Sequence, residues 1–110
     1  MPNIMIIRVQ ANVPWKVGPG MSGSVWVAVC EPLKLTVQAE TWSDLMEDIS
    51  DTLDAVFSDL LQSNELPQFL KRHGWELMTP LPTKPKDLRF DVPFMPAWMG
   101  DNGPKNTVYQ

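Results

Sequence analysis

A long amphipathic pattern in the middle of the chain constrains the fold more than any other feature. From Trp42 to Leu60, apolar residues recur at spacings of three and four, which places them on one arc of an α-helix. They are Trp42, Leu45, Met46, Ile49, Leu53, Val56, Phe57 and Leu60. Thr41 is suited to cap the first turn, with Asp44 at the third helical position. The pattern predicts a helix that runs to about Gln62 and buries one face.

The opposite arc of this helix carries acidic charge and no basic residue. Its members are Asp44, Glu47, Asp48, Asp51, Asp54 and Asp59. A plain solvated face fits this pattern, and so does a docking surface for a basic partner, because charge of one sign steers association with the other. A divalent cation fits less well, because one convex helix face does not converge oxygen ligands on an ion.

Three strand patterns precede the helix. Ile4–Val9 and Val25–Cys30 are β-branched apolar runs, and Leu35–Ala39 alternates apolar with polar residues. The short connection between the last two strands predicts an antiparallel hairpin. Asn12–Gly23 contains several prolines and glycines, and we expect it to be a loop.

Two shorter patterns follow the long helix. Leu66–His73 predicts a second helix, with Gly74 as its left-handed C-terminal cap. Trp75–Leu81 and Leu88–Val92 are strand candidates. The chain as a whole is therefore expected to be α+β: a three- to four-stranded, antiparallel-rich sheet with one long helix packed on one face and a short second helix.

Proline and charge divide the chain near residue 81. Six prolines lie at or beyond Pro80, where they remove amide donors and block helix formation. Residues 1–81 carry a net charge of −5 and residues 82–110 a net charge of +1. We therefore expect a body, residues 1–81, and an extended proline-rich C-terminal arm, residues 82–110.

The arm contains large apolar residues that would lie in water if it were a free segment. They are Phe90, Phe94, Met95, Trp98 and Met99. Such residues gain nothing from contact with water, so the arm is too apolar for a simple linker. It is expected either to pack on its own sheet or to clasp a partner, for which an extended segment is suited.

Composition narrows the class of function. The net charge is −4, which argues against a basic nucleic-acid surface. One cysteine and one histidine exclude a disulfide framework, a cysteine zinc cluster and a two-histidine metal motif. We expect no cofactor and no metal. The N-terminus lacks the pattern of a signal peptide and no apolar run approaches membrane-spanning length, so a cytoplasmic location is expected.

No catalytic motif is visible in the sequence. Cys30 ends an apolar strand and is expected to be a buried, inert thiol. His73 follows two cations at a helix end, where all three complement the helix dipole; a catalytic role for His73 is the alternative. The chain is therefore expected not to be an enzyme.

A specific string joins the second and third strands to the helix. Ser24-Val25-Trp26-Val27-Ala28 lies on the second predicted strand, and Leu35–Leu45 (LTVQAETWSDL) crosses from the third strand into the helix. Over residues 4–65 this order and helix start resemble the HicB-like antitoxin domain. The resemblance implies a curtailed ribonuclease-H-like sheet covered by one helix. It also implies a role: such domains bind and silence a small basic ribonuclease toxin of the HicA type, and commonly form dimers or higher oligomers.

The chain departs from the family pattern in its turn and its C-terminus. Pro32-Leu33-Lys34 lacks the glycine usual before the third strand, and the arm does not suit the DNA-binding motif that many members carry. A working ribonuclease H needs acidic residues on its central strands to hold two metal ions. Ile4–Val9 and Val25–Cys30 contain none, so the sequence argues against catalysis on this fold.

The sequence thus favours a binding protein that neutralises a basic, HicA-like toxin by protein–protein contact, without binding membranes or nucleic acid. A solitary self-associating domain with no toxin partner is the alternative, and a homo-oligomer, dimer or tetramer, is expected in either case. The expected contact residues are four acids for steering and three aromatic residues for burial: Asp44, Glu47, Asp48, Asp51, Phe90, Phe94 and Trp98.

Overall fold

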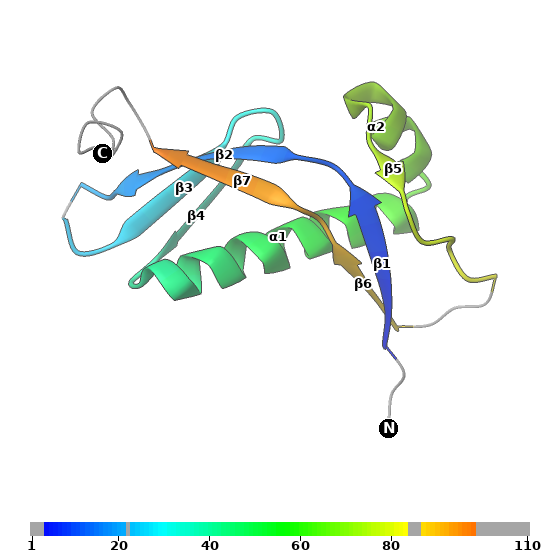
Figure 1. Cartoon of the computed structure of the whole chain (residues 1–110), viewed down its shortest axis with the longest axis horizontal. Helices are drawn as coiled ribbons and strands as arrows, with labels where there is room; N and C mark the ends of the chain where they lie inside the picture. Colours follow the sequence, from blue (N-terminus) through cyan, green and yellow to red (C-terminus); the bar gives the residue numbers. More distant parts are fainter. Residues whose placement is uncertain (1–3, 22, 84–86, 99–110) are drawn as a thin grey trace. The chain divides into compact units, whose positions relative to one another are not determined.

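Four strands come first along the chain, followed by two helices and then three further strands, as Figure 1 shows. The computed structural model describes residues 4–21, 23–83 and 87–98. In chain order the elements are β1 (Ile4–Gln10), β2 (Val13–Pro19), β3 (Trp26–Cys30), β4 (Leu35–Ala39), α1 (Trp42–Gln62), α2 (Leu66–His73), β5 (Glu76–Leu77), β6 (Asp87–Asp91) and β7 (Phe94–Trp98). The predicted α+β class, with one long and one short helix, is confirmed.

The elements form two compact units, each with its own sheet. The first unit comprises Met1–Asn12 and Ser50–Pro93, and the second comprises Val13–Ile49 and Phe94–Gln110. The sheet of the first unit has the order β5-β1-β6, and that of the second has the order β4-β3-β2-β7. The described strands of the predicted arm are divided between the two units: β6 lies in the first unit and β7 in the second.

The first unit is built on a parallel pair of strands. β1 and β6 run parallel from Ile4 opposite Asp87 to Arg8 opposite Asp91, and the short β5 pairs antiparallel with β1. The core side chains come from both of the long strands and from both helices. They are Ile7, Val9, Leu53, Phe57, Leu66, Phe69, Leu70, Phe90 and Val92.

The second unit is built on an antiparallel meander. β2, β3 and β4 pair antiparallel in succession, and β7 adds to β2 in parallel. The predicted β3–β4 hairpin is confirmed. The first two turns of α1 contribute Leu45 and Ile49 to a core that the sheet completes. The sheet residues of that core are Val13, Trp15, Val17, Ala28 and Cys30.

The start of α1 and the end of α2 lie where local chemistry predicts. The backbone N–H of Asp44 donates to Thr41 Oγ1 over 3.0 Å, so Thr41 caps α1 as expected. At the end of α2, Gly74 has a φ of 73° in the left-handed region. There the N–H of Gly74 bonds the Lys71 carbonyl and the N–H of Trp75 bonds the Leu70 carbonyl. This double return is the Schellman motif, which satisfies the last carbonyls of the helix.

The loop predicted at Asn12–Gly23 is wrong, because most of that segment is β2. Its proline and glycine residues indicated turns, but Val13, Trp15 and Val17 alternate into the core. Pro14 lies before the stretch of β2 that pairs with β3, and Pro19 lies beyond the stretch that pairs with β7. Each proline therefore has only one neighbouring strand, so its missing N–H disrupts no central ladder.

Candidate functional site: an exposed tryptophan cluster beside an acidic helix start

Three tryptophan rings of the second unit pack against one another. The Trp26 ring centroid lies 5.3 Å from that of Trp42 and 5.7 Å from that of Trp98. Trp42 and Trp98 are stacked, with centroids 6.4 Å apart and an interplanar angle of 22°. These distances are ordinary for directly interacting aromatic rings, so the rings form one contiguous apolar surface and leave no cage between them.

Strand register explains how residues so far apart in sequence meet. Trp26 of β3 lies opposite Pro19 of β2, and Trp98 of β7 lies opposite Val17 of the same strand. Pro19 and Val17 are two residues apart, so their partners project from the same face of the sheet. α1 then adds Trp42, its first residue, to this face.

The cluster is open to solvent. Trp42 and Trp98 each retain 40% of their accessible surface, and Trp26 is half-buried. Large aromatic side chains are more typical of protein interfaces than of solvent-exposed surface, because water contact with their rings is unfavourable and they bury large areas on binding.

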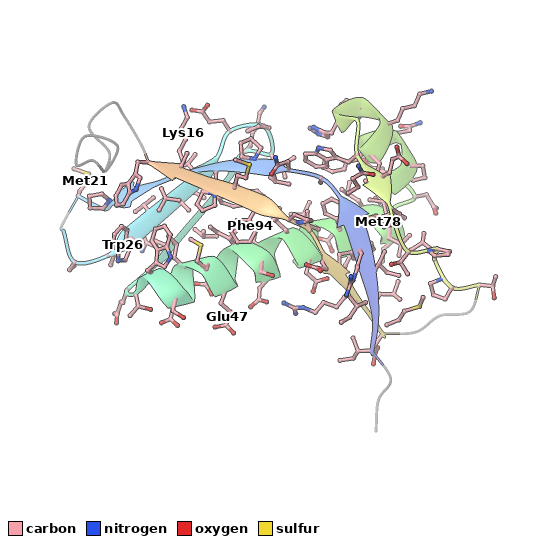
Figure 2. All side chains as sticks on the ribbon, viewed as in Figure 1. Lys16, Met21, Trp26, Glu47, Met78 and Phe94 are labelled. Atoms are coloured by element: carbon pink, nitrogen blue, oxygen red, sulfur yellow. The ribbon has the colours of Figure 1, made fainter. Side chains whose placement is uncertain are left out.

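The first turns of α1 carry acidic side chains beside this cluster in the same unit. Asp44, Glu47 and Asp48 are exposed, and none forms an ion pair within the described residues. In Figure 2, Glu47 projects from the side of α1 that faces away from the sheet, whereas Trp26 lies at the start of α1. The second unit therefore offers both an apolar surface and unpaired negative charge.

The later acids of α1 have a different use. Arg89 of β6 bonds Asp51 Oδ1 through Nη2 at 2.7 Å and lies 3.7 Å from Asp54 Oδ2. The backbone N–H of Phe90 donates to Asp54 Oδ1, also at 2.7 Å. Within the first unit these carboxylates attach α1 to β6. Asp51 was predicted to contact a partner, but its oxygen is already held by Arg89, so we remove it from the candidate site.

The predicted aromatic contacts separate into core and surface. Phe90 is 1% exposed and packs against Phe57 in the first unit, so the prediction that it contacts a partner is wrong. The sequence predicted a strand at Leu88–Val92, but the burial of Phe90 depends on the pairing of that strand with β1. Phe94 is half-buried and Trp98 is exposed, and for both the contact with a partner stays a prediction. Trp26 and Trp42 were missed, although one lies on a predicted strand and the other begins the helix.

Cys30 and His73 both lie in packed surroundings. The Cys30 side chain is fully buried, as predicted, and burial raises the pKa of its thiol while a backbone hydrogen bond involving Leu33 lowers it by less. The ring of His73 lies 4.5 Å from those of Phe69 and Trp75, centroid to centroid, and is stacked on Trp75. No catalytic partner for either residue emerges from these contacts.

An open hollow of about 840 Å³ lies in the first unit. It is lined by the end of α1, by residues 81–83 and by β6, and its polar side chains are Ser58, Gln62, Asn64, Thr83 and Asp87. Among the described residues that line the hollow, Asp87 is the one ionisable side chain, so these residues supply no pair of acid and base groups. Across the described part of the chain, no three metal-ligating side chains converge.

Comparison with known proteins leaves the chain unassigned. No family model matches it, no curated protein matches it, and no solved structure matches it. Among the described residues, neither helix combines the length and the apolar character that a bilayer crossing requires.

Proposed function

We propose that this protein is a binding module that neutralises a small basic protein, in the manner of the HicB-like antitoxins its sequence resembles. The observation that carries the proposal is the tryptophan cluster, Trp26, Trp42 and Trp98, which stands half-exposed at the start of a helix whose first acids are unpaired. Aromatic anchors supply most of the binding energy in protein interfaces, and charge around them sets the rate of encounter.

The resemblance rests on three predicted strands before the long helix. In the structure four strands, β1 to β4, precede α1, and the last three of them form an antiparallel meander. The string that carries the resemblance spans β3, β4 and the first turn of α1, and it therefore contains Trp26, Trp42 and Asp44. The identity of the partner as a HicA-like ribonuclease rests on the resemblance alone.

The mechanism follows from the two kinds of residue. Asp44, Glu47 and Asp48 attract a basic surface and speed association. Trp42 and Trp98 then lose contact with water in the complex and slow dissociation. If the partner's basic surface is where it binds RNA, the complex excludes RNA by occupying that surface, and the protein inhibits without any reaction of its own.

Affinity capture from the native lysate tests the proposal, with the partner identified by mass spectrometry. We expect the tagged protein to retain one small basic protein that is lost at high salt. A variant with Asp44→Asn, Glu47→Gln and Asp48→Asn should retain much less of it. The matched control carries Asp59→Asn, Glu65→Gln and Glu76→Gln, which make the same change in net charge at exposed positions of the first unit.

The captured protein is then assayed for RNA cleavage with and without the purified chain. Inhibition that is complete at a stoichiometric ratio supports the antitoxin role. Capture of a basic protein that does not cleave RNA would support the proposed binding surface but contradict the identification of the partner as a ribonuclease toxin. Equal capture by the triple variant and its control would contradict the binding surface itself.

The alternative function is self-association without a toxin. The second unit has an unprotected sheet edge, which favours self-association. Self-association at this edge would accompany the proposed partner binding and would not replace it.

A further inference from the structure

The two sheets have four outer edges, and three of them carry a feature that blocks pairing with another strand. At the β6 edge, the N–H of Phe90 already donates to Asp54. At the β7 edge, Pro96 lies in mid-strand and lacks an N–H. β5 is only two residues long. Natural sheets use such features to prevent edge-to-edge association.

The fourth edge, β4, has no such feature. Its five residues, Leu35–Ala39, include no proline and no charge, and within the described residues β3 is its one neighbour. Leu35, Val37 and Ala39 are half-buried on one face, and Thr36 and Gln38 are exposed on the other. An edge of this kind presents unpaired N–H and C=O groups to a further strand.

We propose that the β4 edge binds a second copy of this chain, in an antiparallel two-fold pair centred on Val37. In that register Leu35 lies opposite Ala39 of the other copy, and Thr36 lies opposite Gln38, so apolar residues meet on one face and polar residues on the other. The pair would join two four-stranded sheets into one continuous sheet.

The charges that flank β4 favour this register. Lys34 precedes the strand and Glu40 follows it, and both are exposed. Lys34 lies in the turn before β4, with a φ of 57°, so a two-fold centred on Val37 brings Lys34 of each copy to the end of the pair where Glu40 of the other copy lies. Neither residue forms an ion pair within the described residues, so both are available to a second copy. A shift of two residues in either direction would break both charge pairs and leave one end of each strand unpaired.

This inference does not depend on the proposed function, because it uses β4 and its flanks rather than the tryptophan cluster or Asp44, Glu47 and Asp48. Five residues on each copy make a small interface. We therefore expect a dissociation constant of about 1 to 100 µM rather than a permanent dimer.

A charge swap tests the inference on the full-length chain by sedimentation equilibrium. Lys34→Glu sets two acids opposite each other at both ends of the pair, and Glu40→Lys sets two bases opposite each other. Each single variant should weaken dimerisation by about tenfold or more. An equimolar mixture of the two should dimerise about as well as the wild type, because each end then holds opposite charges again. Lys71→Glu, on α2, is the control and should dimerise like the wild type.

Circular dichroism of each variant checks that it is folded, and the recovery in the mixture excludes misfolding as the cause of weak self-association. A wild-type chain that stays monomeric up to about 500 µM would overturn the inference, since that exceeds the expected dissociation constant. It would be overturned equally by single variants that dimerise like the wild type, or by a mixture that gains nothing over its components.

Discussion

The two units each hold an aromatic cluster, and the two clusters differ in burial rather than in geometry. In the first unit, Phe57 lies 5.6 Å from Phe69, 6.4 Å from Trp75 and 5.6 Å from Phe90, measured between ring centroids. In the second, the tryptophan centroids lie 5.3 to 6.4 Å apart. Phe57 is completely buried, whereas Trp42 and Trp98 are 40% exposed.

The same contrast runs along α1. The acids near its start are exposed and unpaired within the described residues, whereas Asp51 and Asp54 bind β6. Similar residues on one helix thus serve stability in one unit and remain available in the other. Ring contacts and helix periodicity alone do not distinguish the two roles, and burial and hydrogen bonding do.

The largest effect expected from this comparison is on stability in the first unit. Phe57→Ala removes a fully buried ring that contacts three aromatic neighbours, and should lower the free energy of unfolding by about 3 to 5 kcal/mol. Urea denaturation followed by circular dichroism measures this. A loss below about 1 kcal/mol would show that the first unit does not depend on its aromatic core.

The second-largest loss of unfolding free energy is expected at Asp54. Asp54→Ala leaves the N–H of Phe90 without its acceptor and should cost about 1 to 3 kcal/mol, while Asp54→Asn keeps an oxygen at that place and should cost less. Glu47→Ala on the same helix should change stability by less than about 0.5 kcal/mol. Equal losses for Asp54→Ala and Glu47→Ala would erase the distinction between engaged and available acids.

Trp98→Ala should separate binding from stability. Because the ring is already 40% exposed, we expect a loss of about 2 kcal/mol in unfolding free energy, below that for Phe57→Ala. Dissociation of the captured partner, measured by surface plasmon resonance, should accelerate by about tenfold or more. A stability loss equal to that of Phe57→Ala would make the tryptophan cluster a core rather than an interface.

The smallest expected effect concerns the core of the second unit. Burial raises the pKa of the Cys30 thiol above its ordinary value of 9.0, so the folded chain keeps this proton after the unfolded chain has released it. The contribution of the protonated Cys30 thiol to folding stability is therefore complete below pH 9.0 and declines as the pH rises through the pKa of the folded state. Cys30→Ala should remove this alkaline decline. Rapid labelling of Cys30 by a thiol reagent in the native wild type would contradict its burial.

Local sequence patterns correctly predicted the features that depend on neighbouring residues, such as helix ends and the alternation of a strand. Thr41 and Gly74 mark helix ends through contacts within a few residues, and both helices follow from them. The alternation of β4 was equally readable. β2 was missed because Pro14 and Pro19 suggested turns. A strand can accommodate these prolines only because the pairing with β3 does not reach Pro14 and the pairing with β7 does not reach Pro19, which the sequence does not show.

The sequence did not predict the features of the site that depend on contacts between residues far apart in the chain. Asp51 meets Arg89 across 38 positions of sequence, so helix periodicity placed it with the solvated acids. Phe90 looked like part of an arm until its parallel pairing with Ile7 placed it in a core. Trp98 was found because it is a large apolar residue in a proline-rich segment, but its contact with Trp26 depends on the sheet register.

The central claim, that the tryptophan cluster is the binding surface, is tested most directly by hydroxyl-radical footprinting. The oxidation rate of each tryptophan is compared in the free chain and in the complex with the captured basic partner. Trp42 and Trp98 should become several-fold less reactive, while Trp75, half-buried in the first unit, should keep its free rate. Unchanged reactivity of Trp42 and Trp98 in a fully formed complex would contradict the account.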